Sequence, residues 1–286
     1  MKLALGTAQF GLDYGVANRV GKPSRADLIA ILGAAREAGI HVLDTATAYG
    51  DSERNLGESG LASFDVISKV PLVPTDVVPF DWLLSSVKGS LQRLSKNSLE
   101  GLLLHRPLQL LEPRGEAIYE ALLSLKGSGL VDKIGISVYS PDELDLLCSR
   151  YALDIVQIPF NIMDRRLLTS GWLDRLSATG TEVHVRSVLL QGLLAMSSEE
   201  RPSYFDEWGA LWSSYDQWLL DNELGRQEAC VRYALSFNEI KKVVVGVDTL
   251  AQLQQILSFT RLPTLSVPDA ISSADEHLLN PGLWKI

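Results

Sequence analysis

Four side chains in the first part of the chain have types that together suit one reaction, the reduction of a carbonyl group. They are Asp44, Tyr49, Lys69 and His105. A phenol such as Tyr49 gives up a proton near neutral pH only where a cation stabilises the phenolate, and Lys69 can be that cation if Asp44 keeps it charged. His105 can donate a hydrogen bond that holds the carbonyl oxygen near Tyr49. The set could therefore protonate an oxygen while a hydride reaches the adjoining carbon.

Each of these residues ends or follows a short apolar run, and such runs recur along the whole chain. Several are apolar throughout, as at Val243–Val245, which is typical of strands buried on both faces of a parallel sheet. Amphipathic segments separate the runs. The alternation of strand and helix predicts a (β/α)8 TIM barrel of the α/β class, with residues 1–286 forming a single domain. The predicted strands are Leu3–Gly6, His41–Thr45, Asp65–Val70, Gly101–Leu104, Lys133–Val138, Asp154–Ile158, Glu182–Val188 and Lys242–Val247.

Capping residues and glycines mark the ends of the helices between these strands. Ser24 precedes one helix, with Asp27 three residues on, and Gly39 follows it. Ser140 and Pro141, followed by two acids, mark the start of another. The other predicted helices are Phe80–Leu94, Gly115–Ser128, Arg165–Ala178, Arg226–Leu235 and Leu250–Ser258, besides Arg25–Ala38 after Ser24.

The spacing widens before the last predicted strand, where an insert covers about residues 195–239. It holds Trp208, Trp212 and Trp218, and this spacing indicates a helix face packed on the barrel. A C-terminal tail of about residues 262–286 follows the last predicted helix.

Side chains at the carboxyl ends of the strands form the active site in barrels of this kind. Asp44, Lys69 and His105 are predicted to lie at the ends of three adjacent strands, with Tyr49 in the loop after the first of them. A lone tyrosine or histidine in a loop is more often a packing residue, and a lone Asp–Lys pair is usually an ordinary salt bridge. Four matched groups at one end of the barrel instead indicate a catalytic site, because a buried acid and base without a task would destabilise the fold.

The charge and composition narrow the class of partner. Lys+Arg 26 against Asp+Glu 35 gives a net charge of −9, which argues against nucleic acid or an anionic membrane as the main partner, although a local cluster could still bind an anionic substrate. No apolar run approaches the roughly 18 residues of a membrane span, and the start is neither a signal peptide nor an anchor, so we expect a cytoplasmic protein. Cys148 and Cys230 are expected as buried small hydrophobes. The scattered histidines predict no metal site.

Motifs along essentially the whole chain resemble those of the aldo-keto reductase superfamily, in a bacterial-type, short-loop form. The resemblance implies a nicotinamide-dependent carbonyl reductase or alcohol dehydrogenase in which Asp44, Tyr49, Lys69 and His105 are the catalytic tetrad. The matching stretches are Leu5–Gly11, Leu43–Ala46 with Tyr49–Gly50, Ser52–Glu53 and Leu56–Gly57, Ile67–Lys69, Leu102–Pro107, Ile134–Ser137, Gln157, Leu189–Leu194 and Gly246–Gln252.

The same resemblance implies that the cofactor lies across the barrel mouth. Ser137 and Gln157 would bond the nicotinamide amide, the Ser187–Leu194 loop would follow the pyrophosphate, and Gly246–Gln252 would face the adenosine ribose. The residues expected to bind the cofactor are Gly6, Thr7, Asp44, Ser137, Gln157, Arg186, Ser187, Leu189, Gly192, Gly246, Asp248 and Gln252.

Three positions depart from the family pattern. Val138 replaces an asparagine that contacts the nicotinamide amide, and Arg186 replaces an aromatic ring that stacks on nicotinamide. We hypothesise that Arg186 favours the reduced, uncharged ring over the oxidised one. Asp248 stands where NADP-using relatives carry a cation, and an acid can bond a free 2′-hydroxyl but repels a 2′-phosphate. NADP(H), the family default, stays slightly ahead, with NAD(H) as the alternative.

The expected partner is a small carbonyl compound, and the protein is expected as a monomer or weak homo-oligomer. Besides Tyr49 and His105, Tyr14 and Trp284 could line the substrate pocket. Asp13 and Asn161 favour a sugar-like aldehyde or ketone. Two other functions stay open, a non-catalytic dinucleotide-binding or regulatory barrel and a lyase or isomerase in which Lys69 forms a Schiff base.

Overall fold

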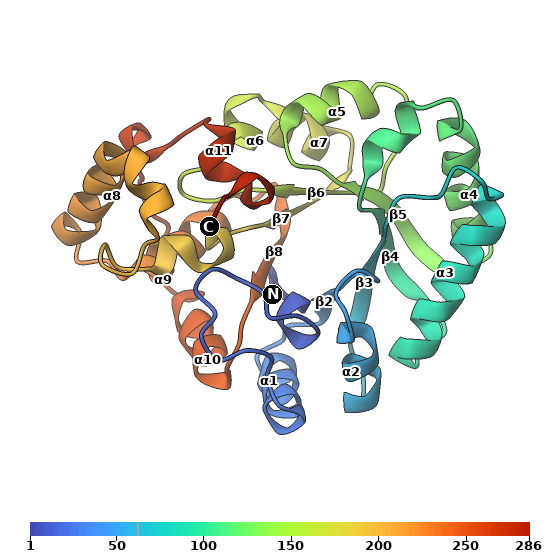
Figure 1. Cartoon of the computed structure of the whole chain (residues 1–286), viewed down its shortest axis with the longest axis horizontal. Coiled ribbons are helices and arrows are strands. Elements are labelled where there is room, and N and C mark those ends of the chain that lie inside the picture. Colours follow the sequence, from blue (N-terminus) through green and yellow to red (C-terminus); the bar gives the residue numbers. More distant parts are fainter. Residues whose placement is uncertain (62) are drawn as a thin grey trace.

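Eight parallel strands close into a barrel in the computed structural model, which describes residues 1–61 and 63–286 (Figure 1). Each strand pairs with the next along the chain, and β1 pairs with β8 to complete the circle, with Leu3 opposite Val243 and Gly6 opposite Gly246. The (β/α)8 prediction is therefore confirmed. The strands are β1 (Leu3–Gly6), β2 (Val42–Asp44), β3 (Asp65–Val70), β4 (Leu99–Leu104), β5 (Val131–Ser137), β6 (Ile155–Pro159), β7 (Glu182–Arg186) and β8 (Ile240–Gly246).

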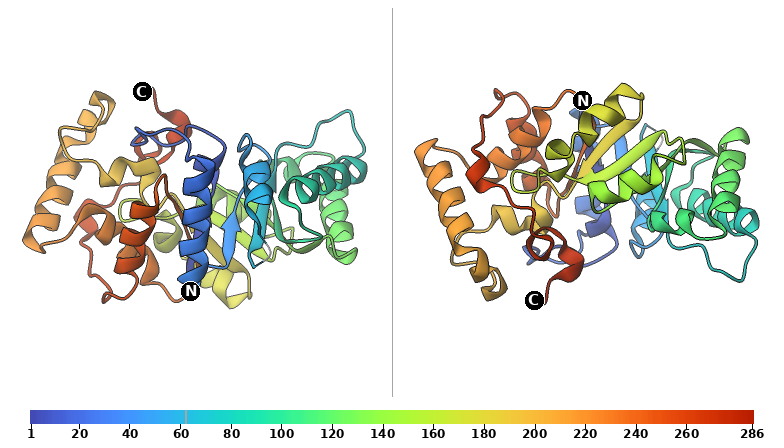
Figure 2. Two further views of the ribbon diagram at one scale, coloured as in Figure 1. Left: turned by 90° about the horizontal axis from the view of Figure 1, so that it is seen from below. Right: turned by 90° about the horizontal axis from the view of Figure 1, so that it is seen from above.

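Helices surround the strands, and Figure 2 shows them on both sides of the barrel. The two predicted helix starts carry capping boxes, formed by Ser24 and Asp27 before α1 and by Ser140 and Glu143 before α5. The helices are α1 (Arg25–Glu37), α2 (Ser52–Ser59), α3 (Pro79–Leu94), α4 (Gly115–Gly127), α5 (Pro141–Leu147), α6 (Arg166–Thr169), α7 (Trp172–Ala178), α8 (Gly209–Asp221), α9 (Arg226–Leu235), α10 (Leu250–Phe259) and α11 (Glu276–Leu279).

The strands bury apolar side chains on both faces. A small cluster fills the barrel interior, and a much larger one lies between the strands and the helices. This explains why the strand sequences are apolar almost throughout, since neither face meets water. The interior cluster consists of Ala4, Val42, Ile67, Leu103, Ile155 and Val244.

Some predicted boundaries were wrong. β7 ends at Arg186 rather than Val188, because Ser187 adopts a φ of 59°, which a strand cannot continue. The single helix expected at Arg165–Ala178 is two helices, α6 and α7, separated by Gly171 at a φ of 75°. Residues Ser52–Ser59, for which no helix was predicted, form α2. Cys148 is half-buried at the end of α5, whereas Cys230 is buried as expected.

The insert before β8 forms α8 and α9 with short 3₁₀ turns, at one end of the molecule (Figure 1). Trp212 and Trp218 of α8 are buried in the main core, whereas Trp208 ends a 3₁₀ turn and packs against that core half-buried, so the three do not share one helix face. The C-terminal tail is bonded to this insert: Trp208 Nε1 donates to Asp275 Oδ2 at 3.0 Å.

Candidate active site

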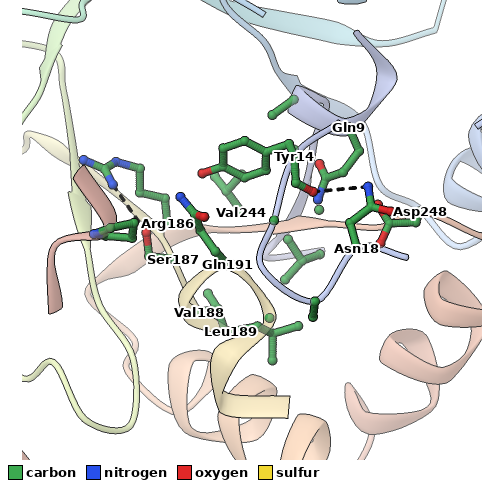
Figure 3. A pocket seen from close by; sticks show the side chains of 18 of the residues that line it. Gln9, Tyr14, Asn18, Arg186, Ser187, Val188, Leu189, Gln191, Val244 and Asp248 are labelled. Carbon is green, nitrogen blue, oxygen red and sulfur yellow. Dashed lines mark hydrogen bonds between the residues drawn. The ribbon is translucent and has the colours of Figure 1, made fainter. Parts of the chain in front are cut away.

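A cavity of about 440 Å³ opens at the carboxyl ends of the strands, where barrel enzymes carry their active sites. The last residues of four strands line it, namely Gly6 of β1, Asp44 of β2, Arg186 of β7 and Gly246 of β8. Loop residues from both ends of the chain complete the wall (Figure 3). The predicted residues Tyr49, His105, Tyr14, Thr7, Ser187, Leu189, Gly192, Asp248 and Gln252 all line this cavity.

A buried ion pair lies in the barrel mouth. Lys69 is 0% exposed, and its Nζ lies 2.5 Å from Asp44 Oδ1 and 3.0 Å from the Thr45 carbonyl oxygen. Burial alone would lower the pKa of Lys69, but the Asp44 carboxylate and the Tyr49 oxygen outweigh it and raise the pKa above the ordinary value. Lys69 is therefore a charged ammonium inside the barrel.

The second oxygen of Asp44 extends this pair across the barrel. Gln157 Nε2 donates to Asp44 Oδ2 at 2.7 Å, and Ser137 Oγ donates to Gln157 Oε1 at 3.3 Å. Both residues are buried and come from β6 and β5. The structure thus brings Ser137 and Gln157 beside Asp44, although neither lines the cavity. Their contact with a nicotinamide amide remains a prediction.

Tyr49 accepts the third hydrogen bond of the ammonium, with its Oη 3.5 Å from Lys69 Nζ. Its loop is held by close approach of the backbone after β1, because a Cβ on Gly11 would collide with the Tyr49 carbonyl oxygen. Ser52 Oγ ties the same loop to the Thr7 carbonyl oxygen at 2.8 Å. The phenol is therefore fixed at the cavity wall beside the charged lysine.

His105 lies across from this phenol, with the ring centroids 6.0 Å apart and the ring planes at 76°. Burial lowers the pKa of His105 to about 4, and the positive charges of Lys69 and Arg186 contribute in the same direction. The imidazole is accordingly neutral around pH 7, with one ring N–H available as a donor.

A buried carboxylate behind the site had no assigned role in the sequence. Glu53 of α2 is 2% exposed and accepts hydrogen bonds from Ser68 Oγ at 2.7 Å and from Arg93 Nε at 2.9 Å. Ser68 directly precedes Lys69, so this network fastens α2 and α3 to the strand that carries the lysine. The motif Ser52–Glu53 was the only sequence signal for it.

The loop after β7 forms a strained wall of the cavity. Ser187, Leu190 and Gln191 have positive φ angles, and Gly192 has a φ of 92°. A Cβ on Gly192 would lie 2.5 Å from the Cβ of Ala17 in the loop after β1. Backbone strain in residues other than glycine persists where the surrounding structure enforces it, often at binding sites. The two loops therefore meet closely over the cavity (Figure 3).

Two acceptor oxygens on the cavity wall lack donors. Asp248 Oδ1 and Gln227 Oε1 are buried with no hydrogen-bond partner in the described chain. Burial raises the pKa of Asp248, and the Gln252 side chain opposes the rise. Separately, the Asp248 backbone N–H donates to Gln252 Oε1 at 2.6 Å. Gln227 comes from α9 of the insert and was not predicted from the sequence, since nothing in its local pattern distinguishes it from a surface helix residue.

Trp284 does not line the cavity, contrary to our expectation. Its indole N–H donates to the Leu278 carbonyl oxygen at 3.0 Å, and its ring packs edge-on against Phe205 of the insert, 5.0 Å between centroids. Pro281 and Gly282 of the tail line the cavity instead. Tyr14 is at the wall, with 37% of its surface exposed.

Arg186 lies at the end of β7 with its guanidinium turned towards β5. It donates to the Val138 carbonyl oxygen at 3.0 Å, and it lies 4.5 Å from the ring centroid of Tyr139. Whether it distinguishes the redox states of a nicotinamide remains a hypothesis.

The comparisons with known proteins agree with this geometry. A model of the Aldo/keto reductase family matches residues 2–277. The chain belongs to the aldo/keto reductase family. It is therefore an oxidoreductase of the kind that uses a nicotinamide cofactor and a small-molecule substrate.

Relatives of this aldo/keto reductase include D-threo-aldose 1-dehydrogenase from Pseudomonas sp, 27% identical over 304 aligned residues that cover 91% of this chain and 92% of that protein. Oxidoreductase YdhF from Escherichia coli (strain K12) is 33% identical over 98 residues, 34% of this chain and 32% of that one. Two solved structures share the fold at 20% identity. Aldo-keto reductase AKR11C1 from Bacillus halodurans has a TM-score of 0.74 over 99% of this chain and 94% of its own. Glycerol dehydrogenase AKR11B4 from Gluconobacter oxydans has a TM-score of 0.71 over 93% of this chain and 88% of its own.

Among residues 1–61 and 63–286 of this aldo/keto reductase, no helix is long and apolar enough to span a membrane. The same residues contain no group of three or more histidine, cysteine, aspartate or glutamate side chains that could hold a metal ion.

The first prediction concerns His105 and pH. Its pKa is about 4 in the folded protein and 6.5 without the fold, so between these values only the unfolded chain takes up a proton. The contribution to the free energy of unfolding is complete above pH 6.5 and is lost as the pH falls towards 4. Denaturant unfolding should show that the free energy of unfolding falls by about 2–4 kcal/mol more in wild type than in His105→Asn as the pH is lowered from 6.5 to 4. Equal losses in both proteins would contradict the buried, neutral histidine.

The second prediction concerns the contact between the two loops. Gly192→Ala should lower the free energy of unfolding by about 1–3 kcal/mol, because it adds both a strained φ and a collision with Ala17. Gly180→Ala is the matched control, since Gly180 has a φ of 76° but no atom near its added Cβ. The double variant Ala17→Gly/Gly192→Ala should recover the steric part. A Gly192→Ala loss no greater than that of Gly180→Ala would show that the loops do not meet closely.

Proposed function

We propose that this aldo/keto reductase reduces an aldehyde or ketone to an alcohol, with Tyr49 as the proton donor. The observation that carries the proposal is the charged Lys69, which contacts Tyr49 Oη and Asp44 Oδ1 at the wall of the cavity. An acid whose conjugate base meets a fixed ammonium can donate a proton near neutral pH. The nicotinamide cofactor supplies the hydride when bound.

Each of the four residues then has a distinct task. Tyr49 Oη gives its proton to the substrate oxygen as negative charge develops there. Lys69 stabilises the phenolate that remains, and Asp44 keeps Lys69 protonated. The neutral His105 donates its N–H to the same oxygen and orients the carbonyl.

The charged lysine argues against the Schiff-base alternative. A Schiff base requires a neutral amine as nucleophile, and the raised pKa of Lys69 opposes its deprotonation. The non-catalytic alternative gives no reason for a buried lysine to lie beside a phenol on a cavity wall, because such an arrangement has no value for dinucleotide binding alone.

We place the adenosine half of a dinucleotide at the end of the cavity opposite Arg186. Asp248 Oδ1 and Gln227 Oε1 are buried acceptors that need donors, and the ribose hydroxyls and adenine amino group of a dinucleotide are donors. The residues that would hold the cofactor are the cavity-lining residues expected from the sequence, other than Arg186, together with Gln227.

We infer that the cofactor is NAD(H). Among the described residues that line the cavity, Arg186 is the only lysine or arginine, and Figure 3 places it on the opposite side from Asp248. A 2′-phosphate beside Asp248 would meet a carboxylate and no cation, whereas a free 2′-hydroxyl can donate to Asp248 Oδ1. The family default of NADP(H) therefore gives way to the alternative.

The substrate class we favour is a polyhydroxylated, sugar-like aldehyde or ketone. The relative of 27% identity that spans nearly the whole chain is named as an aldose dehydrogenase.

Replacement of Tyr49 tests the proposed function. Tyr49→Phe should lower kcat for NADH oxidation with aldoses by on the order of 10³-fold, because the proton donor is removed. Tryptophan fluorescence titration should give an unchanged Kd for NADH, which shows that the fold and cofactor site persist. Loss of less than about tenfold in kcat would rule out Tyr49 as the acid.

The cofactor inference has its own test. Wild type should bind NADH at least about 10-fold more tightly than NADPH, and Asp248→Lys should move that ratio towards NADPH by about 10- to 100-fold. Asp132→Lys, which makes the same charge change at an exposed site at the start of β5, should leave the ratio unchanged. Both Kd values come from fluorescence titration. Tighter binding of NADPH by wild type would contradict the role of Asp248.

A further inference from the structure

Arg186 is a cation at the Tyr49 and His105 end of the cavity, and it has no counter-ion among the described residues. It takes part in none of the ion pairs within the described chain, although carboxylates outnumber cations in the protein as a whole. Its protein partners are neutral: the Val138 carbonyl oxygen at 3.0 Å, Ser187 Oγ at 3.3 Å and the ring of Tyr139. A half-buried guanidinium paired only with neutral groups retains its full charge for a ligand.

The neighbours of Arg186 fix its plane and leave donors available. A guanidinium has five N–H donors, and these contacts use one on Nη1 and one on Nη2. The guanidinium carbon lies over the Tyr139 ring, 4.5 Å from its centroid. A planar fork of donors held in this way matches the two oxygens of a carboxylate or phosphate.

The direction of the side chain places its charge near the proposed reaction centre. Arg186 ends β7, but its Nη2 reaches past β6 to the residue that follows β5. His105 follows β4, the next strand in the barrel, and the charge of Arg186 contributes to the lowered pKa of that histidine. The loop after β7 leans the other way, towards Ala17 and the loop after β1. The guanidinium therefore lies on the side of the cavity towards β4 and His105.

We propose that Arg186 binds an anionic group on the substrate, so that the enzyme acts on aldehydes or ketones that carry a carboxylate or phosphate. This inference rests on the proposed carbonyl reduction. The same oxyanion chemistry could come from the pyrophosphate of the cofactor, and the experiment separates the two sources. Combined with the hydroxylated class favoured above, the proposal points to sugar acids or sugar phosphates with a free carbonyl group.

The test compares pairs of aldehydes that differ in the anionic group, glyceraldehyde 3-phosphate with glyceraldehyde and succinic semialdehyde with butanal. Wild type should show kcat/KM at least about 10-fold higher for the anionic member of each pair. Arg186→Met should raise KM for the anionic members by about 10- to 100-fold and leave the neutral members within about threefold. Arg186→Lys keeps the charge without the planar fork of donors. Its KM for the anionic members should lie between the values of wild type and Arg186→Met. Arg261→Met is the control, because Arg261 is exposed beyond α10.

Calorimetric binding of glycerol 3-phosphate and glycerol, without turnover, provides a readout that does not depend on the proposed reaction. Selective loss of glycerol 3-phosphate binding in Arg186→Met supports the proposed anion site, even if no aldehyde is reduced. Failure to reduce any aldehyde would contradict only the proposed reductase function. Equal use of anionic and neutral aldehydes by an active wild type would overturn it. A weaker Kd for NADH in Arg186→Met, with the preference for anionic aldehydes unchanged, would also overturn it and assign the guanidinium to the pyrophosphate.

Discussion

The ion pair of Lys69 and Asp44 is the interaction on which the barrel mouth depends. An ammonium that is 0% exposed is tolerated only because a carboxylate, a carbonyl oxygen and a phenol surround it. Removal of one partner from a buried pair typically destabilises a protein by about 3–5 kcal/mol, since the other charge is left uncompensated. Through Gln157 and Ser137 the same carboxylate connects β2 with β6 and β5, so the electrostatics of the site also fix the geometry of four strands.

The charges and burial around this pair also give Tyr49 and His105 different roles as hydrogen-bond donors. Lys69 stays charged because Asp44 outweighs burial, while His105 stays neutral because burial and two cations act in the same direction. One phenol then lies next to a permanent cation and faces a neutral imidazole. Tyr49 therefore serves as the proposed proton donor and His105 as the donor that orients the carbonyl, because the surrounding charges and burial act differently on the two side chains. Proteins commonly assign acid and base roles in this way.

The fold and the central residues could be predicted from sequence because their signals are local. Runs such as Val243–Val245 have the composition of doubly buried strands, and the carboxyl ends of parallel strands meet at one edge. These two signals are enough to predict that Asp44, Lys69 and His105 lie at the same end of the barrel. By contrast, Gln227 and Trp284 depend on how the insert and the tail pack, which no periodicity records. The direction of the Arg186 side chain likewise depends on Tyr139 and Val138, which lie far from it in the sequence.

The closure of the barrel has a thermodynamic consequence for its ligands. β1 and β8 pair along the seam, and the cavity wall is built from residues on both sides of it, such as Thr7 and Gly246. A molecule bound in the cavity therefore makes its full set of contacts only while β1 is paired with β8. Ligand binding and seam pairing are linked equilibria, and each factor of ten in ligand excess over Kd adds about 1.4 kcal/mol against separation of the first strand from the last.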